Sequence, residues 1–384
     1  MNTDRLLTVT DLPSLFADYY QTADFTVEDI VRREIALQPF GAVGPNIRSL
    51  SFQNTTDLTA KLLERPPSAV FASVGYYMDP NERQMAKKDI RGYDLVFDID
   101  ADNFEGSYYD LVAHLCVSTK ILIDTFLVGH FGFKREDMRI EFSGRKGFHV
   151  TLTDKALCDL SKEDRRQIID YVTGKSLNRD LIFPTKLNHP TSPSKSGGWT
   201  KLANDWLNAI LDESESVNSS ELCKAILVKY CVPKKYATKK QGDLLTDPQV
   251  RKSLREGRLS SLIGTSEKAL NGFVSAVVKY YKQQLGSVID RRVTADRSRI
   301  FRVPGSLHPK SGLPCMTIPY EYLGLPELIF DKAYTVVGED MVQILLNRFA
   351  TIDLYEQETF GPGIHEVPRW KAIAILCALY RSRR

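Results

Sequence analysis

The sequence contains little cysteine, and the spacing of its six cysteines does not indicate cross-links. They occur in a chain of 384 residues and form no CxxC or other paired spacing. Disulfide frameworks are typical of short, cysteine-dense secreted chains, whereas unpaired cysteines are typical of reducing compartments. The pattern therefore argues against disulfides and favours an intracellular protein.

Long hydrophobic runs and a targeting signal are also missing. We see no apolar stretch that approaches the ~20 residues of a membrane span. The N-terminus, MNTDRLLTVTDLPSLF, has no basic segment followed by uninterrupted apolar residues, so no signal peptide is expected. These absences predict a soluble intracellular protein that has no membrane partner.

Neither sign of charge dominates. Lys plus Arg is 51 and Asp plus Glu is 48, which gives a net charge of +3. This balance excludes a histone-like protein or an acidic tail. The 43% of hydrophobic residues and 26% of charged residues predict a folded chain with a sizeable core, in one large or two smaller domains.

Hydrophobic periodicity and turn residues predict an α/β (α+β) fold. We expect helices at 11–21, 26–38, 55–65, 108–131, 341–349 and 367–380, and strands at 47–52, 69–77, 93–100, 138–143, 148–153, from about 287 to 302, and 315–319. Residues 155–286 show helical periodicity with polar loops. The sequence thus predicts a catalytic body of residues 1–154 and 287–384, with 155–286 as a mainly helical insertion.

Two carboxylates end the apolar run LVFDID. In a strand, alternate side chains share a face, so Asp98 and Asp100 project together while Phe97 and Ile99 face the core. Paired carboxylates repel each other, and a divalent cation is the usual reason for keeping them together. The alternative is a solvated strand end. Haloacid-dehalogenase-like phosphatases also carry DxD, but they need Thr or Val at the position of Asp102.

A second motif, SGRKGFH at 143–149, combines the groups that bind phosphate. Glycines let the backbone approach an anion, and Ser143, Arg145, Lys146 and His149 supply a hydroxyl, two cations and an imidazole. His149 alternates with Phe148 and Val150, so it faces away from the apolar side of its strand. The alternative is a basic hairpin tip, but the preceding DxD strand favours a functional role.

A third stretch runs from IDRRVT at 289–294 to PGSLH at 304–308. Asp290 is a candidate third metal ligand, and Arg302 and His308 are candidates to meet the same phosphates as Arg145 and His149. An ordinary strand in which Asp290 pairs with a neighbouring arginine explains the spacing equally well. The residues alone leave both interpretations open.

Taken together, these motifs resemble the catalytic small subunit of the archaeal and eukaryotic DNA primase, and the archaeal version more closely. The matching stretches occur in the family's order and span almost the whole chain: RREIALQPF (32–40), IRSLSFQ (47–53), ASVGYYMDP (72–80), DLVFDIDAD (94–102), HFGF (130–133), SGRKGFHV (143–150), IDRRVTADRSRIFRVPGSLHPKSGL (289–313) and HEVPRW (365–370). The combination is specific, whereas each motif alone is modest.

The resemblance implies a primase–polymerase fold, with a mixed β-sheet core flanked by helices and an inserted helical subdomain. It implies that Asp98, Asp100 and Asp290 bind two Mg²⁺ or Mn²⁺ ions. It also implies that the nucleotide's triphosphate is held by a group of mostly basic residues: Ser143, Arg145, Lys146, His149, Arg302 and His308, with Arg33 and Arg48 near the site.

The resemblance further implies template-directed nucleotidyl transfer, in which short primers are made on single-stranded DNA from nucleoside triphosphates. The partners are then the DNA template, the primer 3′ end, a large subunit in a heterodimer, and the replication machinery. An archaeal-type host implies the cytoplasm, and a eukaryotic one the nucleus. Two other functions stay open: a metal-dependent nucleotide-sugar glycosyltransferase, and a non-catalytic nucleic-acid-binding subunit.

The chain departs from many relatives in the interval between DxD and SGRxG. Those relatives carry a zinc-binding cluster there, whereas this interval offers only His114, Cys116 and His130. Structural zinc needs four close ligands, so we expect no zinc, with the helix 108–131 packed directly on the core.

The insertion contains a basic stretch. From Lys224 to Arg258 there are ten Lys or Arg and three acids, a net of +7. This stretch is either a flap that binds template by charge or an ordinary solvated face.

Overall fold

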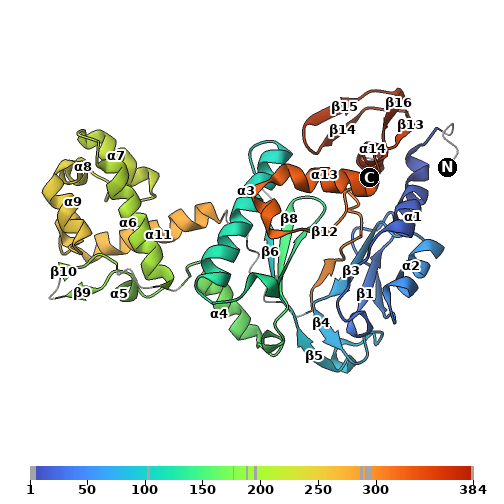
Figure 1. Ribbon diagram of the computed structural model, residues 1–384, viewed down its shortest axis with the longest axis horizontal. Coiled ribbons are helices and arrows are strands. Elements are labelled where there is room, and N and C mark those ends of the chain that lie inside the picture. The colour runs from blue at the N-terminus through green and yellow to red at the C-terminus, as the bar shows by residue number, and fades with distance from the viewer. Residues whose placement is uncertain are drawn as a thin grey trace. The chain divides into compact units, whose positions relative to one another are not determined.

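The computed structural model describes residues 6–101, 104–175, 177–186, 189–193, 197–285, 289, 296 and 298–381. The chain forms two compact units (Figure 1). Unit 1 comprises Met1–Lys120, Arg135–Arg166 and Val288–Arg384, and unit 2 comprises Ile121–Lys134 and Gln167–Ser287. This division differs from the expected one at two places, because 155–166 falls in unit 1 and 121–134 falls in unit 2.

The first sheet of unit 1 carries the DxD and SGRKGFH motifs. Its strand order is β12-β7-β8-β6, formed by Met316–Thr317, Met138–Phe142, Gly147–Leu152 and Leu95–Asp100. All three pairings are antiparallel. Because β6 and β8 pair over six residues from Leu95↔Leu152 to Asp100↔Gly147, the register of the two motifs is fully specified.

The second sheet of unit 1 joins both ends of the chain. Its strand order is β11-β3-β1-β2, formed by Ile300–Arg302, Ala69–Ser73, Ile35–Gln38 and Ile47–Leu50. A separate hairpin pairs β4, Gly75–Tyr77, with β5, Ile90–Tyr93. The pairings between the described strands are antiparallel throughout, and with the flanking helices they confirm the α+β class.

Two helices expected from the sequence are strands in the structure. Residues 341–349 contain β13, Met341–Leu346, which pairs with β16, Gly363–Pro368. Residues 26–38 contain only a short 3-10 turn, Ile30–Arg32, before β1. In both cases a partner strand satisfies the backbone hydrogen bonds, and this outweighs a local pattern that fits a helix. A further hairpin pairs β14, Ala350–Asp353, with β15, Gln357–Phe360.

Five helices belong wholly or mostly to unit 1: α1 Leu12–Thr22, α2 Thr55–Glu64, α3 Tyr108–Ile121, α13 Pro326–Val337 and α14 Arg369–Arg381. Helix α4, Lys162–Val172, crosses the boundary between the two units. Helix α2 begins where the Asn54 side chain accepts a hydrogen bond from the Asp57 amide, and it ends before Pro66 and Pro67. Helices α1 and α14 pack together although they come from opposite ends of the chain (Figure 1).

The helix after the DxD strand, expected at 108–131, spans Tyr108–Val128 and is strongly apolar. By length and composition alone, Tyr108–Val128 could cross a membrane, but 56% of its apolar window is buried inside the protein. Its first part, α3, is followed by a π-helix at Leu122–Val128. The expectation that no apolar run approaches membrane length is corrected here, and the burial is typical of a core helix.

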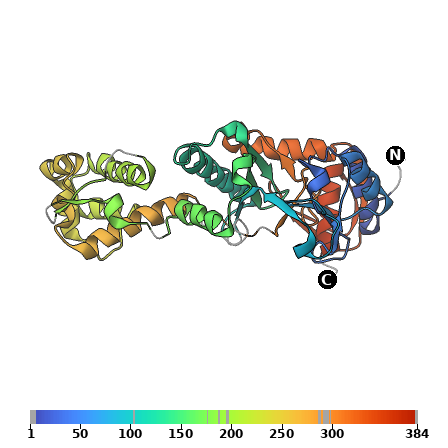
Figure 2. The ribbon, with the colours of Figure 1, turned by 90° about the horizontal axis from the view of Figure 1, so that it is seen from below.

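Unit 2 is mainly helical (Figure 2). It contains α5 Arg179–Ile182, α6 Gly198–Ser214, α7 Ser220–Lys229, α8 Lys239–Thr246, α9 Pro248–Arg255, α10 Ser260–Ile263 and α11 Glu267–Gln284, with a short hairpin of β9 Thr185–Lys186 and β10 His189–Pro190. Trp206 and Phe273 are buried in its core, with ring centroids 5.7 Å apart.

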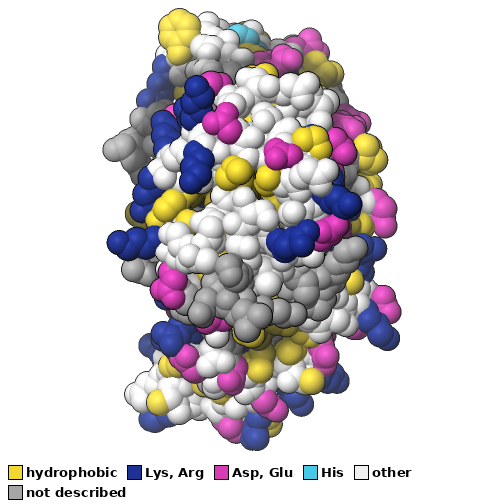
Figure 3. All heavy atoms as spheres, turned by 90° about the vertical axis from the view of Figure 1, so that its left-hand side faces the viewer, with side chains coloured by type: hydrophobic (Ala, Val, Ile, Leu, Met, Phe, Trp, Pro, Cys, Tyr) yellow, Lys and Arg dark blue, Asp and Glu magenta, His cyan; other side chains and the backbone are white. Residues whose placement is uncertain are grey.

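The basic stretch 224–258 lies on these helices and is partly neutralised. Arg255 pairs with Asp212 at 2.6 Å and Lys229 with Glu213 at 2.7 Å, and both acids lie outside the stretch. On the face shown in Figure 3, Lys and Arg side chains alternate with Asp and Glu. These contacts favour a solvated, salt-bridged surface over a dedicated template-binding flap.

A buried ion pair anchors the start of the DxD strand. Arg33 Nη2 lies 2.6 Å from Asp94 Oδ2, and both side chains are almost fully buried. The same guanidinium donates to the carbonyls of Ser73 and Val74, and Tyr76 Oη donates to Asp94 Oδ1 at 2.7 Å. Arg165 donates to the carbonyls of Asp94 and Tyr93. The chain is therefore held from two sides where β6 begins.

We expect Arg33→Ala to destabilise the protein by about 3–5 kcal/mol, because it leaves the Asp94 carboxylate buried without its partner. The matched control is Arg91→Ala, which breaks the exposed Arg91–Asp89 pair at 2.7 Å and is expected to cost about 0–1 kcal/mol. Urea unfolding followed by circular dichroism measures both. Equal losses in the two variants would contradict the anchoring role.

Candidate active site

The two carboxylates of the DxD motif share one face of β6, as the alternation predicts. Phe97 and Ile99 are fully buried on one side of the strand, whereas Asp98 is half-buried and Asp100 is exposed on the other. The apolar side chains fix the strand against the core. The carboxylates are thereby presented together without any need for a flexible loop.

A row of polar side chains crosses the sheet at Asp98. Cross-strand pairing puts Asp98 opposite His149 on β8, and His149 opposite Glu141 on β7. His149 Nε2 lies 3.7 Å from Asp98 Oδ1, and His149 Nδ1 lies 3.8 Å from Glu141 Oε2. His149 thus sits between two carboxylates, and its ring is 4.5 Å from the ring of Phe301 on β11.

Glu141 is a site residue that sequence reasoning missed. Burial alone raises the pKa of this carboxyl, but Arg139, whose Nε lies 2.7 Å away, and His149 outweigh burial, so the pKa is lowered. Glu141 is therefore an ionised, buried neighbour of His149. The available signal was period-two alternation, which places Arg139, Glu141 and the strand end on one face of β7.

Side chains from other segments hold the turn between β7 and β8 by hydrogen bonds to its backbone carbonyl groups. Arg302 Nη1 donates to the Ser143 carbonyl at 2.9 Å, Ser311 Oγ donates to the Gly144 carbonyl at 2.6 Å, and Tyr108 Oη donates to the Arg145 carbonyl. Gly144 has φ +82°, and a Cβ there would lie 2.7 Å from the Leu313 carbonyl oxygen. Only glycine fits this crossing of the two motifs.

Hydrogen bonds connect the PGSLH segment to β3 of the second sheet and to the residues that precede β12. Ser306 Oγ accepts a hydrogen bond from the Val70 amide at 2.8 Å, and the His308 amide donates to the Leu313 carbonyl at 2.7 Å. His308 Nδ1 accepts from the Lys310 amide at 3.0 Å. In the neutral imidazole the proton is then on Nε2, which is free to donate to a ligand.

These elements enclose a pocket of about 370 Å³, the main pocket. Its lining combines two carboxylates with a basic wall and comprises Phe71, Asp98, Asp100, Ser143, Arg145, Lys146, Gly147, His149, Arg299, Ile300, Phe301, Arg302, His308 and Lys310. The basic residues outnumber the acids, as a site for a polyanion requires.

Arg302 is the most informative member of this wall. Burial lowers the pKa of its guanidinium, and its Nε atom is buried without a hydrogen-bond partner. Within the described part of the chain, no carboxylate lies within ion-pairing distance of Arg302. Arg302 as a whole is half-buried, and an anion that accepts a hydrogen bond from its buried Nε would satisfy this donor, so the site fits a phosphate ligand.

The structure brings eight of the predicted residues together at the main pocket: Asp98, Asp100, Ser143, Arg145, Lys146, His149, Arg302 and His308. It also adds Arg299 and Lys310, of which Lys310 lies two residues after PGSLH in the sequence. Asp290 lies outside the described residues. The chain just before it is placed, since Ile289 forms an antiparallel bridge with Ile99, between the two aspartates of the DxD motif.

Arg33 and Arg48, which the resemblance puts near the site, are not among the residues that line this pocket. Arg33 is committed to Asp94. Arg48 Nε lies 2.6 Å from Glu34 Oε1, and the same buried carboxylate pairs with Lys88 at 3.0 Å. Both arginines are explained by their structural partners.

The donor set fits a hard divalent cation in part. Asp98 and Asp100 offer carboxylate oxygens on one face, and these are the ligands that Mg²⁺ and Mn²⁺ prefer. Within the described residues no group of three acidic, histidine or cysteine side chains is positioned to hold a metal ion. The predicted third ligand, Asp290, is not among those residues.

Comparisons with known proteins agree with this geometry. The family model described as DNA primase small subunit matches residues 97–318, a segment that contains both walls of the main pocket. The chain belongs to the DNA primase small subunit family. It is 29% identical to the DNA primase small subunit PriS of Methanococcoides burtonii, over 95% of this chain and 96% of that protein. The corresponding proteins of Methanocella arvoryzae and Halobacterium salinarum are 28% and 27% identical, over 86% and 94% of this chain and the same shares of those proteins.

We expect Gly144→Ala to weaken nucleotide binding and to destabilise the protein by about 1–3 kcal/mol, because the added Cβ strains a left-handed residue and meets the Leu313 carbonyl. Gly44→Ala is the control, since a Cβ there meets nothing within 4 Å. Nucleotide titration and urea unfolding measure the two effects. A Gly144→Ala protein that behaves like Gly44→Ala would contradict this account of the turn.

We expect His308 to stay neutral in the folded protein at pH 6. Burial, then the charges of Arg302 and Arg145, hold its pKa well below the usual value. The unfolded chain binds a proton near pH ~6.5, so His308 lowers stability as the pH falls below that value. NMR titration of its imidazole resonance tests this, with the urea-unfolded chain as reference. A folded-state midpoint at or above 6.5 would overturn it.

Proposed function

We propose that this chain is the catalytic subunit of a DNA primase, which makes short primers on single-stranded DNA by nucleotidyl transfer from nucleoside triphosphates. The observation that carries the proposal is the main pocket itself, which two carboxylates on β6 share with Arg302, a half-buried arginine that has no acidic partner among the described residues. Membership of the primase family supplies the reaction class.

Each side of the pocket has a separate task in this proposal. Arg145 and Arg302 neutralise the triphosphate of the incoming nucleotide, and His308 donates a hydrogen bond from Nε2 as a neutral group. The carboxylates of Asp98 and Asp100, with Asp290 as the expected third, hold Mg²⁺ or Mn²⁺. When bound, such ions lower the pKa of a primer 3′-hydroxyl and stabilise charge on the phosphates. The 3′-oxygen then bonds to the α-phosphorus, and pyrophosphate leaves.

His149 orients the carboxylate side of the pocket. Its ring lies between Asp98 and the ionised Glu141, and it packs against Phe301. Since β6, β8 and β11 hold these groups, the geometry depends on strands rather than on loops. Rigid placement of this kind supplies much of the rate enhancement when the reacting groups are held in register.

The other elements of the proposal rest on the family. The partners are single-stranded DNA, the primer 3′ end, a primase large subunit in a heterodimer and the replication machinery, with no membrane, and the location is the cytoplasm of an archaeal-type cell. We assign no zinc to the chain. The family match covers DxD, SGRKGFH and PGSLH together, which favours primase over a nucleotide-sugar glycosyltransferase.

We expect Asp98→Asn and Asp100→Asn each to lower primer extension by about 100-fold or more, because they remove charge from the metal-binding face. Extension of a preformed primer on single-stranded template is the assay, since it does not need the large subunit to start a chain. Asp89→Asn is the control, because Asp89 is an exposed acid that lies outside the main pocket. Primer extension at the wild-type level by both variants would contradict the active-site assignment.

A further inference from the structure

A second pocket of unit 1 adjoins the main pocket and shares part of its basic wall. This distal pocket has a volume of about 230 Å³ and shares Arg145, Lys146 and Lys310 with the main pocket. Apart from Ser311, its own residues come from elements outside the recognised motifs. They comprise Tyr108, Ser311, Thr351, Ile352, Asp353, Leu354, Ala374, Ala378 and Arg381.

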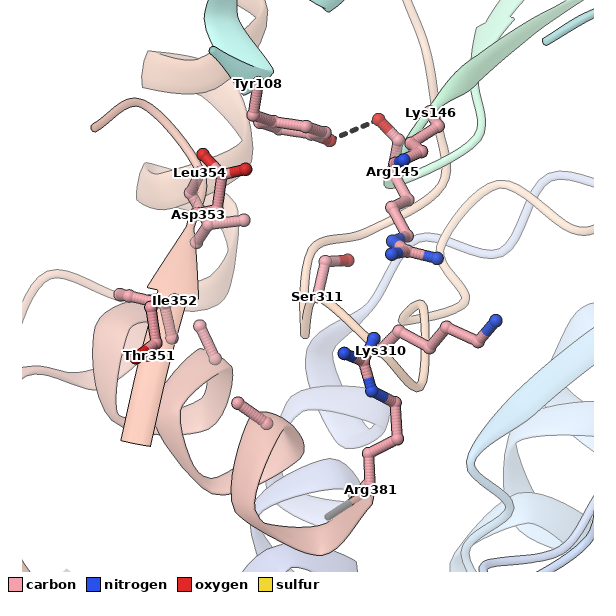
Figure 4. Close-up of a pocket in the computed structure, with 12 residues that line it drawn as sticks. Tyr108, Arg145, Lys146, Lys310, Ser311, Thr351, Ile352, Asp353, Leu354 and Arg381 are labelled. Atoms are coloured by element: carbon pink, nitrogen blue, oxygen red, sulfur yellow. Dashed lines mark hydrogen bonds between the residues drawn. The ribbon is translucent and has the colours of Figure 1, made fainter. Parts of the chain in front are cut away.

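The cations of the distal pocket gather on one side. Figure 4 shows Arg145 and Arg381 on the side of the pocket opposite Asp353 of β14, with Lys310 beside them and its ammonium group extending away from Asp353. Arg381 ends α14, and Arg145 is placed by the hydrogen bond that its carbonyl accepts from Tyr108. Two loops, strand β14 and the helices α3 and α14 therefore converge on the pocket.

In the described part of the chain, the acids near these positive charges are few. Within the described part of the chain, none of Arg145, Lys146, Lys310 and Arg381 has a carboxylate within ion-pairing distance. Burial and then the charge of Arg381 lower the pKa of Arg145, and burial and then Arg145 and Arg381 lower that of Lys310. Asp353 is the one acid of the lining. Such a cluster repels itself until an anion enters.

The size and position of the pocket identify the anion. A volume of 230 Å³ suits a small compact anion rather than a polymer chain. The pocket begins where the basic wall of the main pocket ends, so a phosphate group can pass from one to the other without leaving the field of Arg145 and Lys310. The small polyanion that forms in the main pocket is the leaving group of nucleotidyl transfer.

We propose that the distal pocket is a second anion site, which takes inorganic pyrophosphate as it departs from the main pocket. The proposal deepens the proposed primase function and rests on it for the source of the anion. The site itself needs only the cluster of Arg145, Lys310 and Arg381. Arg381 belongs to the distal pocket alone and is the residue on which the test depends.

Binding of inorganic pyrophosphate is measured by isothermal titration calorimetry on the full chain, with Mg²⁺ present and without template. A saturating non-hydrolysable nucleoside triphosphate occupies the main pocket. We expect the wild type to retain one pyrophosphate site under these conditions, and Arg381→Gln to bind about tenfold more weakly, since it loses one charge-assisted contact. Arg83→Gln, at an exposed arginine outside both pockets, is expected to bind like the wild type.

A second variant tests the anion site independently, in case Arg381→Gln weakens binding only because it disturbs α14. Ala378→Glu places a negative charge in the lining without touching the main pocket, and it is expected to abolish the site. The proposal is overturned if the nucleotide removes all pyrophosphate binding from the wild type, or if Arg381→Gln and Ala378→Glu bind as the wild type does. The titration measures binding and no catalysis. A chain that binds pyrophosphate at the distal pocket but does not extend a primer would therefore contradict the primase assignment without contradicting the anion site.

Discussion

The antiparallel register of β6 against β8 is the constraint on which the candidate site depends. Asp98 lies opposite His149 and Asp100 opposite Gly147 because the two strands pair over six consecutive residues. A shift by one residue would turn both carboxylates into the core and Phe97 and Ile99 outward. The buried Arg33–Asp94 pair and the two hydrogen bonds from Arg165 hold the chain at the start of this strand. The position of the carboxylates thus depends on residues that never reach the pocket.

The pairing of each arginine separates structural from functional charge. Arg33 and Arg48 have a carboxylate at 2.6 Å and contribute to the fold. Arg302 and Arg145 have no carboxylate partner in the described part of the chain, and both have a lowered pKa, mainly through burial. Charged groups are kept in this state where a ligand of opposite charge completes them. Lys310 and Arg381 at the distal pocket likewise have no carboxylate partner in the described part of the chain.

Sequence reasoning was reliable where the pattern was local and strongly periodic. It located the strands β6, β7 and β8, helix α2 with its stop before the prolines, and the helical character of 167–285. It failed at 26–38 and 341–349, where the structure has strands, and it overlooked α13, whose first residue is Pro326. Strands such as β13 depend on a partner that is distant in sequence, so their periodicity within one segment is weak evidence. Proline at the start of a helix was the signal available for α13.

For the site, the sequence by itself determined the chemistry: which carboxylates, cations and imidazoles are present, and that DxD places two carboxylates on one face. Local alternation and motif composition are sufficient for that. Only the tertiary structure decided which of these groups meet. It joined PGSLH from residues 304–308 to the turn at 143–146, removed Arg33 and Arg48 from the site, and brought in Glu141, Arg299, Lys310 and, at the distal pocket, Arg381. The physical reason is that ion pairing and burial depend on contacts across hundreds of residues, which no local period encodes.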